Sequence, residues 1–105
     1  EVIYLIAKPK FRLAKQANAY GDVWEFNQEM KNPHPAPFPV QLIERIISST
    51  SAQIILDPFM GSGTTAIASI NYNRDYIGIE LSQEYVDLAN KRIETNVPQK
   101  QLKIL

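Results

Sequence analysis

Apolar residues recur at helical spacing in three segments of the chain after residue 39. The first predicted helix covers about residues 40–49, and the second begins near Thr64 and closes at residues 71–73. The third follows Ser82, a residue type that caps helices well, and stops before Pro98. Their buried faces are predicted to carry Leu42, Ile43, Ile46 and Ile47, then Ala66, Ile67, Ala68 and Ile70, then Leu81, Tyr85, Leu88, Ala89 and Ile93.

Short uninterrupted apolar runs lie between these helices. Residues 54–56 and 76–79 form such runs, which are typical of parallel strands buried on both faces. Residues 102–105 predict the start of a third strand. The alternation of helix and strand predicts an α/β fold, part of a doubly wound, mostly parallel Rossmann-like sheet with helices on both faces.

The first half of the chain has weaker patterns. Residues 2–6 are β-branched or aromatic and predict a strand, and residues 23–26 alternate as a short strand does. Four prolines between residues 33 and 39 exclude a helix there and predict a stiff, extended loop, with Pro39 as the first residue of the next helix. We therefore divide the chain into a tail over residues 1–21 and an α/β portion over residues 22–105.

Composition is that of an ordinary globular protein, with 45% hydrophobic and 21% charged residues among 105. Cysteine is absent, which excludes disulfides and thiolate metal sites, and no apolar run reaches the roughly 20 residues that cross a bilayer. With no signal peptide visible, we expect a cytoplasmic protein without a membrane partner. Since the chain begins with Glu1 instead of Met, we expect it to be a piece of a longer protein.

The net charge is zero but unevenly spread. Residues 1–20 contain four basic residues, Lys8, Lys10, Arg12 and Lys15, and one acidic residue, Glu1. A solvated chain end is the ordinary interpretation of this cluster, and contact with nucleic-acid phosphates is the alternative.

A glycine-containing loop, residues 57–65, joins the first predicted strand of the α/β portion to the helix after it. Glycine lets backbone N–H groups approach a ligand closely, and a helix start adds a positive dipole end. A nucleoside-triphosphate loop has Lys after its last glycine, whereas Gly63 is followed by Thr64, so that class is excluded. The string from Gly61 to Ala66 does fit the dinucleotide pattern, which keeps a nicotinamide dehydrogenase as an alternative.

Acidic residues separate these alternatives. Asp57 occupies the strand end, where a carboxylate would repel pyrophosphate but could accept a bond from an ammonium group. S-adenosylmethionine has an ammonium and a sulfonium and no phosphate. Glu80 ends the next strand, at a spacing of roughly 20 residues that suits bonds from both ribose hydroxyls. The plain alternatives are a turn cap for Asp57 and a strand-end cap for Glu80.

The run from Asp57 to Thr65 resembles the cofactor motif of DNA methyltransferases that modify exocyclic amino groups on adenine or cytosine. Residues 73–78, and residues 78–81 with the helix after them, resemble that family's next segments. Residues 34–39 and 42–45 resemble the segment that precedes the cofactor strand in a permuted subgroup with the catalytic half first. Together these similarities cover about residues 22–95.

The resemblance implies a prokaryotic, cytoplasmic enzyme of a restriction-modification system that uses S-adenosylmethionine, with adenine the favoured target. Its partners would be double-stranded DNA and the remainder of the methyltransferase, and a homodimer stays open. No metal is implied. The implied cofactor-binding residues are Asp57, Pro58, Phe59, Gly61, Ser62, Gly63, Thr64 and Thr65 of the loop, Glu80, and His34, Pro35, Ala36 and Phe38.

Roles within this set also follow from the resemblance. The loop with Asp57 would hold the methionine part and Glu80 the ribose. Phe59 and Phe38 would pack on adenine or on the methionine chain, and residues 34–36 would line the methionine end. Plain packing remains the alternative for Phe38, and a satisfied loop histidine for His34.

One family motif is missing from these 105 residues. The family catalyses with an Asp/Asn/Ser-Pro-Pro-aromatic turn that binds the target amine, and this sequence has no adjacent prolines. We therefore expect no catalytic residue in this chain, and a fragment that binds cofactor without transferring methyl groups. A non-catalytic cofactor-binding module or regulatory subunit is the alternative. An enzyme acting on RNA, protein or a small molecule is a further one, against which the His-Pro segment argues.

Overall fold

The computed structural model describes residues 1–27 and 38–96. The helix and strand order predicted from residue 40 onward is confirmed, with boundaries that differ by one or two residues, whereas the strand expected at residues 102–105 lies outside the described ranges. The elements are the 3-10 helix η1 (Lys15–Ala19), α1 (Val40–Ser48), β1 (Ile54–Asp57), α2 (Thr64–Asn71), β2 (Asp75–Gly78) and α3 (Gln83–Asn96).

The helix ends follow from local chemistry. Pro39 is the residue before α1 and not its first residue, and its carbonyl accepts a hydrogen bond from Leu42 N. At the other end the hydroxyl of Ser49 donates to Arg45 O over 2.7 Å, which satisfies a last-turn carbonyl. The predicted cap of α3 is confirmed, since Ser82 Oγ accepts from Tyr85 N at 3.4 Å.

The two strands form a parallel sheet connected through α2. Ile54 pairs with Asp75, and the register runs to Asp57 opposite Gly78. The backbone extends this pairing by one step, because Ile79 N donates to Asp57 O at 2.9 Å. The carboxyl ends of both strands therefore lie side by side, at the edge where the glycine loop begins.

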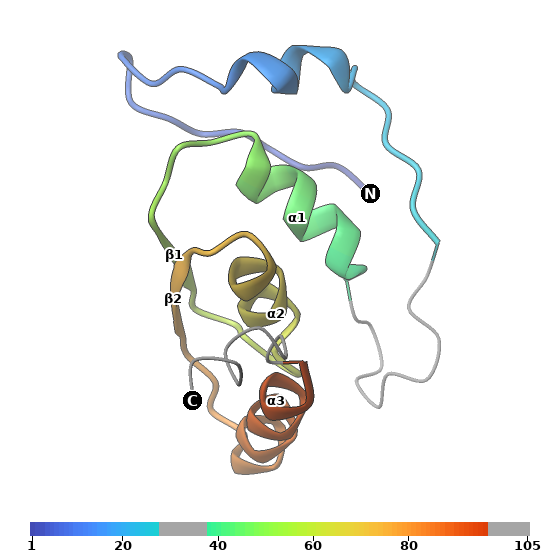
Figure 1. Ribbon diagram of the computed structural model, residues 1–105, viewed down its shortest axis with the longest axis vertical. Coiled ribbons are helices and arrows are strands. Elements are labelled where there is room, and N and C mark those ends of the chain that lie inside the picture. Colours follow the sequence, from blue (N-terminus) through green and yellow to red (C-terminus); the bar gives the residue numbers. More distant parts are fainter. Residues whose placement is uncertain (28–37, 97–105) are drawn as a thin grey trace, which may run out of the picture.

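The core lies between the sheet and the helices. Figure 1 shows α1, α2 and α3 on the same side of the two strands. Helix α2 is the central element and contributes Ala66, Ile67 and Ala68 to the core, together with Ile47 of α1 and Ala89 of α3. The exposed fractions of these five side chains are 5% or less.

The opposite face of the sheet differs from the sequence expectation. Ile54, Leu56 and Ile77 are 60%, 62% and 55% exposed, while Ile55 and Tyr76 between them are half-buried. Continuous apolar runs predicted strands buried on both faces. Within the described residues, helices cover only one face, so alternate strand residues remain in contact with solvent.

The N-terminal segment runs over the C-terminal end of α1 (Figure 1). Ala14 N donates to Ser49 O at 2.9 Å and Gln16 Nε2 to Ser48 O at 3.0 Å. The strands expected at residues 2–6 and 23–26 are wrong, since neither segment has strand structure and residues 2–6 are exposed. The described sheet consists of β1 and β2 alone, so neither segment is paired with a strand among the described residues.

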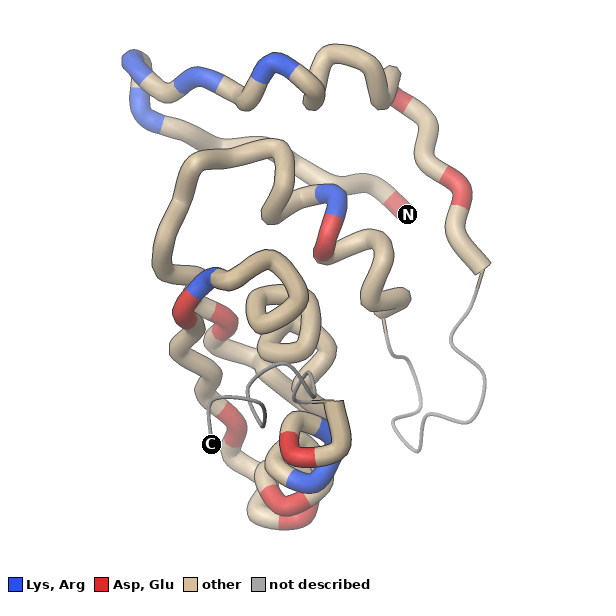
Figure 2. The backbone as a smooth tube through the Cα atoms, viewed as in Figure 1, with Lys and Arg blue, Asp and Glu red and all other residues tan. Residues whose placement is uncertain are grey.

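Three aromatic residues between positions 20 and 26 pack against Arg45 of α1. The guanidinium of Arg45 lies 4.6, 5.2 and 4.5 Å from the ring centroids of Tyr20, Trp24 and Phe26. The residues on the two sides of the expected boundary at 21 and 22 thus contact the same side chain. The charged residues of the N-terminal segment, which include Lys8, Lys10, Arg12 and Lys15, lie on exposed chain away from the sheet (Figure 2).

Candidate functional site

The loop between β1 and α2 carries the candidate site, and its glycines determine its path. Gly61 and Gly63 have φ angles of 53° and 88°, the left-handed region that side chains other than glycine rarely adopt. Gly63 is the residue before α2, and a Cβ added to it would lie 3.0 Å from Ala89 Cβ. Glycine at position 63 therefore permits both the turn into α2 and the close approach of α3.

A third glycine makes room for the loop at the end of β2. A Cβ on Gly78 would overlap the side chain of Met60, which is 8% exposed. Met60 N also donates to Ile79 O at 2.9 Å. The loop is thus held over the end of β2 by a backbone hydrogen bond and by packing against a residue without a side chain.

Asp57 joins the end of β1 to the first turn of α2. Its Oδ1 accepts from Phe59 N at 2.9 Å, and its Oδ2 accepts from the hydroxyl of Thr65 at 2.5 Å. This is the turn-capping arrangement that the sequence left open as an alternative. It does not exhaust the side chain, since an ionised carboxylate accepts about four hydrogen bonds in all.

Glu80 holds the other side of the loop. Its Oε2 accepts from Gly61 N and its Oε1 from Ser82 N, both at 2.9 Å. Asp57, the last residue of β1, and Glu80, two residues after β2, therefore hold the glycine loop from two sides. Both side chains are half-buried, so each can also meet a ligand that approaches the sheet edge.

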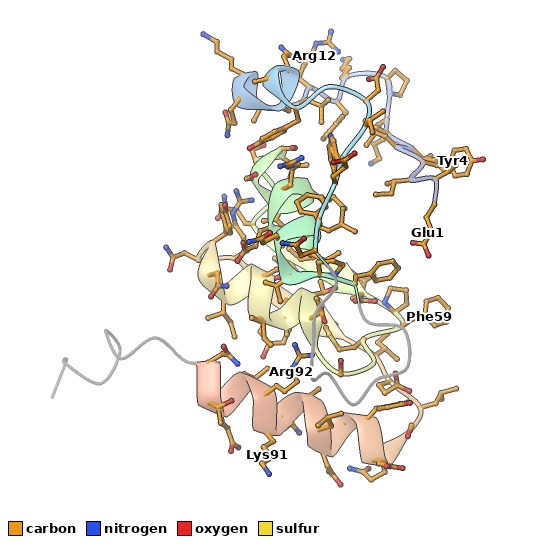
Figure 3. The ribbon with its side chains drawn as sticks, turned by 90° about the vertical axis from the view of Figure 1, so that its right-hand side faces the viewer. Glu1, Tyr4, Arg12, Phe59, Lys91 and Arg92 are labelled. Carbon is orange, nitrogen blue, oxygen red and sulfur yellow. The ribbon has the colours of Figure 1, made fainter. Side chains whose placement is uncertain are left out.

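A residue that the sequence analysis did not select completes the contacts of the loop. Arg92 Nη1 donates to Ser62 O and Ser62 Oγ, both at 2.8 Å, and lies 3.4 Å from Thr64 Oγ1. Figure 3 shows Arg92 on the side of α3 that faces the rest of the molecule and Lys91 on the outer side. The sequence signal at position 92 was only a basic residue near a helix end.

The remaining predicted residues divide by burial. Ser62 and Thr64 are 4% and 7% exposed, whereas Phe59 is 88% exposed and extends away from the loop (Figure 3). Pro58 is exposed, and Phe38, two residues before the start of α1, is 54% exposed and is not part of the described core. The predicted residues His34, Pro35 and Ala36 lie outside the described residues.

The arrangement offers mixed chemistry along one edge of the sheet. Two carboxylates can accept hydrogen bonds from hydroxyl or ammonium groups, and the start of α2 supplies backbone donors with a positive dipole end. The described ranges contain no group of three or more His, Cys, Asp or Glu residues that could bind a metal. None of their helices is both long and apolar enough to cross a membrane.

Comparison with known proteins places this loop in a defined context. The model of a family described as DNA methylase, the N6/N4 methyltransferases, matches residues 5–91. The type II methyltransferase M.BglII of Bacillus subtilis is 47% identical over an alignment of 76 residues, and the match covers 66% of this chain and 21% of the relative. The orphan methyltransferase M.BamHII of Bacillus amyloliquefaciens is 52% identical over an alignment of 66 residues, and the match covers 61% of this chain and 25% of the relative.

Solved structures agree with the fold. The complex of M1.HpyAVI with S-adenosylmethionine is 48% identical, with a TM-score of 0.56 over 59% of this chain and 32% of the relative. The DNA modification methylase TTHA0409 of Thermus thermophilus, described as putative and complexed with S-adenosyl-L-methionine, is 36% identical, with a TM-score of 0.62 over 83% of this chain and 35% of the relative. The doubly wound, Rossmann-like fold class is thereby confirmed.

The chain spans about a fifth to a third of the length of these relatives. The family match nevertheless covers most of its residues and includes β1, the glycine loop, β2 and Glu80. The resemblance inferred from the sequence is confirmed, and the chain belongs to the N6/N4 DNA methylase family.

Proposed function

We propose that this chain is the S-adenosylmethionine-binding portion of a DNA methyltransferase that methylates an exocyclic amino group, in a restriction-modification system. One observation carries the proposal: Asp57 and Glu80, at the ends of adjacent parallel strands, hold the two sides of one glycine loop. Their carboxylates are acceptors of the kind that suits a cofactor with an ammonium group and a ribose diol.

The residues fit the chemical groups of S-adenosylmethionine. Asp57 has acceptor capacity beyond its two contacts, which suits the ammonium group, and the first turn of α2 suits the carboxylate. The carboxylate of Glu80, two residues after β2, is of the chemical type that accepts hydrogen bonds from ribose hydroxyls. When bound, the cofactor supplies an activated methyl group, and the contribution of this chain is to bind and orient it.

Exposed aromatic residues support an apolar contact beside the loop. Phe59 and Phe38 are 88% and 54% exposed, so both rings are accessible to a ligand. We assign Phe59 and Phe38 to contacts with adenine or the methionine chain. We assign His34, Pro35 and Ala36 to the methionine end, on the resemblance of their segment to the family.

The substrate we propose is double-stranded DNA, with adenine favoured over cytosine. The relatives described above are named type II or orphan methyltransferases, and this chain spans 21% and 25% of two of them. The catalytic turn is then carried by the remainder of the methyltransferase, and the present fragment alone is inactive. A prokaryotic cytoplasm is the matching location.

Two surfaces support an association with that remainder. The apolar sheet face of Ile54, Leu56 and Ile77 is more than half exposed in the described chain. Beside it, a groove of about 350 Å³ between α1 and β1 is lined by Ile43, Ile46 and Ile54, among others. In the described residues β1 pairs with β2 alone, so a further strand and a helical layer can add there.

The tail over residues 1–21 is proposed to be the end of a DNA-contacting region, and residues 22–105 to be the cofactor-binding portion. Lys8, Lys10, Arg12 and Lys15 support this, because they lie on exposed chain where phosphates can reach them.

Calorimetry with the full-length protein tests the proposed cofactor. S-adenosylmethionine should bind with a defined stoichiometry, and nicotinamide adenine dinucleotide should give no saturable heat at the same concentrations. Binding of the dinucleotide alone would favour the dehydrogenase alternative. Cofactor binding without methyl transfer to any DNA would favour a non-catalytic module, for which the missing Pro-Pro-aromatic run is the supporting observation.

A further inference from the structure

Arg92 connects α3 to the middle of the glycine loop. One nitrogen of its guanidinium reaches both the carbonyl and the hydroxyl of Ser62, 30 residues away in the sequence. The same nitrogen lies near the hydroxyl of Thr64, the first residue of α2. Ser62 and Thr64 are almost fully buried, so these contacts lie behind the loop and not on its solvent side.

The contact at Ser62 determines the orientation of one peptide group. The carbonyl of Ser62 accepts from Arg92, while the N–H of the same peptide group, on Gly63, donates to Met60 O at 3.0 Å. Both ends of the peptide are therefore held. Because Gly61 and Gly63 on either side have the large backbone freedom of glycine, little else in the loop itself would keep this orientation.

The position of this peptide matters for the start of α2. Gly63 lies between this peptide and Thr64, the first residue of α2, and Arg92 contacts both sides of it, at Ser62 O and at Thr64 Oγ1, so it holds the loop against the helix start. In the proposed function the first N–H groups of α2 receive the amino-acid end of S-adenosylmethionine. The nucleoside end is assigned to Glu80, whose contacts to Gly61 and Ser82 do not involve Arg92.

We propose that Arg92 is a positioning residue that sets the loop for ligands with an amino-acid end. This inference rests on the proposed function. Arg92 does not touch the cofactor, and it acts through Ser62 and Thr64. Its loss should therefore weaken ligands that carry the methionine part far more than ligands that carry only the nucleoside part.

Two ligands separate these ends in a calorimetric test on the full-length protein. S-adenosylhomocysteine carries the amino-acid end, and 5′-methylthioadenosine has the nucleoside end without it. For Arg92→Lys, which keeps the charge but replaces the planar fork by a point donor, we expect about a tenfold loss for S-adenosylhomocysteine and less than about threefold for methylthioadenosine. Arg92→Ala should show the same preference with a larger loss.

Lys91→Ala is the matched control, since it alters a basic residue on the outer side of the same helix turn (Figure 3). It should leave both affinities unchanged. Equal losses for the two ligands with Arg92→Lys, or no loss for either, would overturn the positioning role. Circular dichroism of each variant shows whether folding is kept, and Arg92→Lys serves if Arg92→Ala does not fold. Failure of the wild-type protein to bind S-adenosylhomocysteine would instead refute the proposed function.

Discussion

Gly63 has a left-handed backbone conformation and lies close to Ala89, and each of these features alone disfavours a side chain at this position. Its φ is 88°, and an added Cβ would lie 3.0 Å from Ala89 Cβ and 3.3 Å from Ala89 Cα. Gly63→Ala should therefore cost strain of about 1–3 kcal/mol and overpacking of about a further 1–3 kcal/mol. Urea denaturation of the wild-type and variant proteins measures the sum.

Gly21 is the natural control for this substitution. Its φ is 67°, but nothing lies within 4 Å of an added Cβ, so Gly21→Ala introduces the strain without the contact. We expect Gly63→Ala to lose clearly more stability than Gly21→Ala. Equal losses would mean that α3 yields at Ala89 and that the close packing of the loop on α3 contributes little.

Asp57 and Glu80 could be predicted from the sequence as site residues, because their positions follow from the strands that precede the loop and the next helix. Asp57 ends β1 and Glu80 lies two residues after β2, and the carboxyl ends of parallel strands lie at the same edge of a sheet. The sequence could not predict that Asp57 accepts from Thr65, or that Glu80 accepts from Gly61. Arg92 was missed because its contact depends on how α3 approaches the loop in space.

Helices were predicted more accurately than strands. The limits of α1, α2 and α3 follow from apolar spacing and caps within each segment, which are local properties. A strand needs a neighbour to pair with, so the β-branched run at residues 2–6 does not become one among the described residues. The exposed face of β1 and β2 could not be predicted either, because burial of a strand depends on which other elements cover it.

The exposed sheet face makes a prediction about β1 and β2. Ile54→Thr, Leu56→Thr and Ile77→Thr together keep β-branched or strand-compatible side chains but remove apolar surface from one face. If the remainder of the enzyme covers this face, full-length protein with the three changes should lose roughly 1–2 kcal/mol of unfolding free energy per residue. Chemical denaturation measures the loss.

Val2→Thr and Ile6→Thr provide a comparison, since these exposed side chains lie in the N-terminal segment and not on the sheet. They should change stability less than the three sheet substitutions do. Unchanged stability of the full-length protein with Thr at all three strand positions would show that no further element covers this face.

Charge is unevenly distributed over the molecule, with an excess of basic residues in the N-terminal segment and an excess of acidic residues in the rest. The chain is neutral overall, yet Lys8, Lys10, Arg12 and Lys15 follow one another on the exposed N-terminal segment (Figure 2). If these side chains contact DNA phosphates, replacing all four with Ala should reduce the slope of log affinity against log salt by about 3–4. DNA binding by the full-length protein, measured by fluorescence anisotropy at several salt concentrations, gives this slope.

Replacement of a basic residue outside the N-terminal segment tests whether the change in salt slope depends on the position of the charge. Lys91→Ala removes a cation from the outer side of α3, away from the N-terminal segment, and should leave the slope within error of the wild-type value. An unchanged slope in the fourfold variant would mean that this segment is a solvated chain end without a role in DNA binding.

Asp57 provides the most direct test of the cofactor site as a whole. Asp57→Asn removes the charge, while the amide oxygen can still accept from Phe59 N and the amide nitrogen can donate to the Thr65 hydroxyl. The turn is thereby kept and the bond to an ammonium group is weakened. Asp75→Asn makes the same chemical change at the first residue of β2, at the other edge of the sheet from Asp57, and serves as the control.

The measurement is isothermal calorimetry of S-adenosylmethionine with the full-length protein and these two variants. Because a charge-assisted bond is lost, the dissociation constant of Asp57→Asn should be about 10- to 100-fold higher than that of the wild type. Its melting temperature should be unchanged, and Asp75→Asn should bind as the wild type does. An Asp57→Asn protein that is folded and binds S-adenosylmethionine as tightly as the wild type would contradict the account.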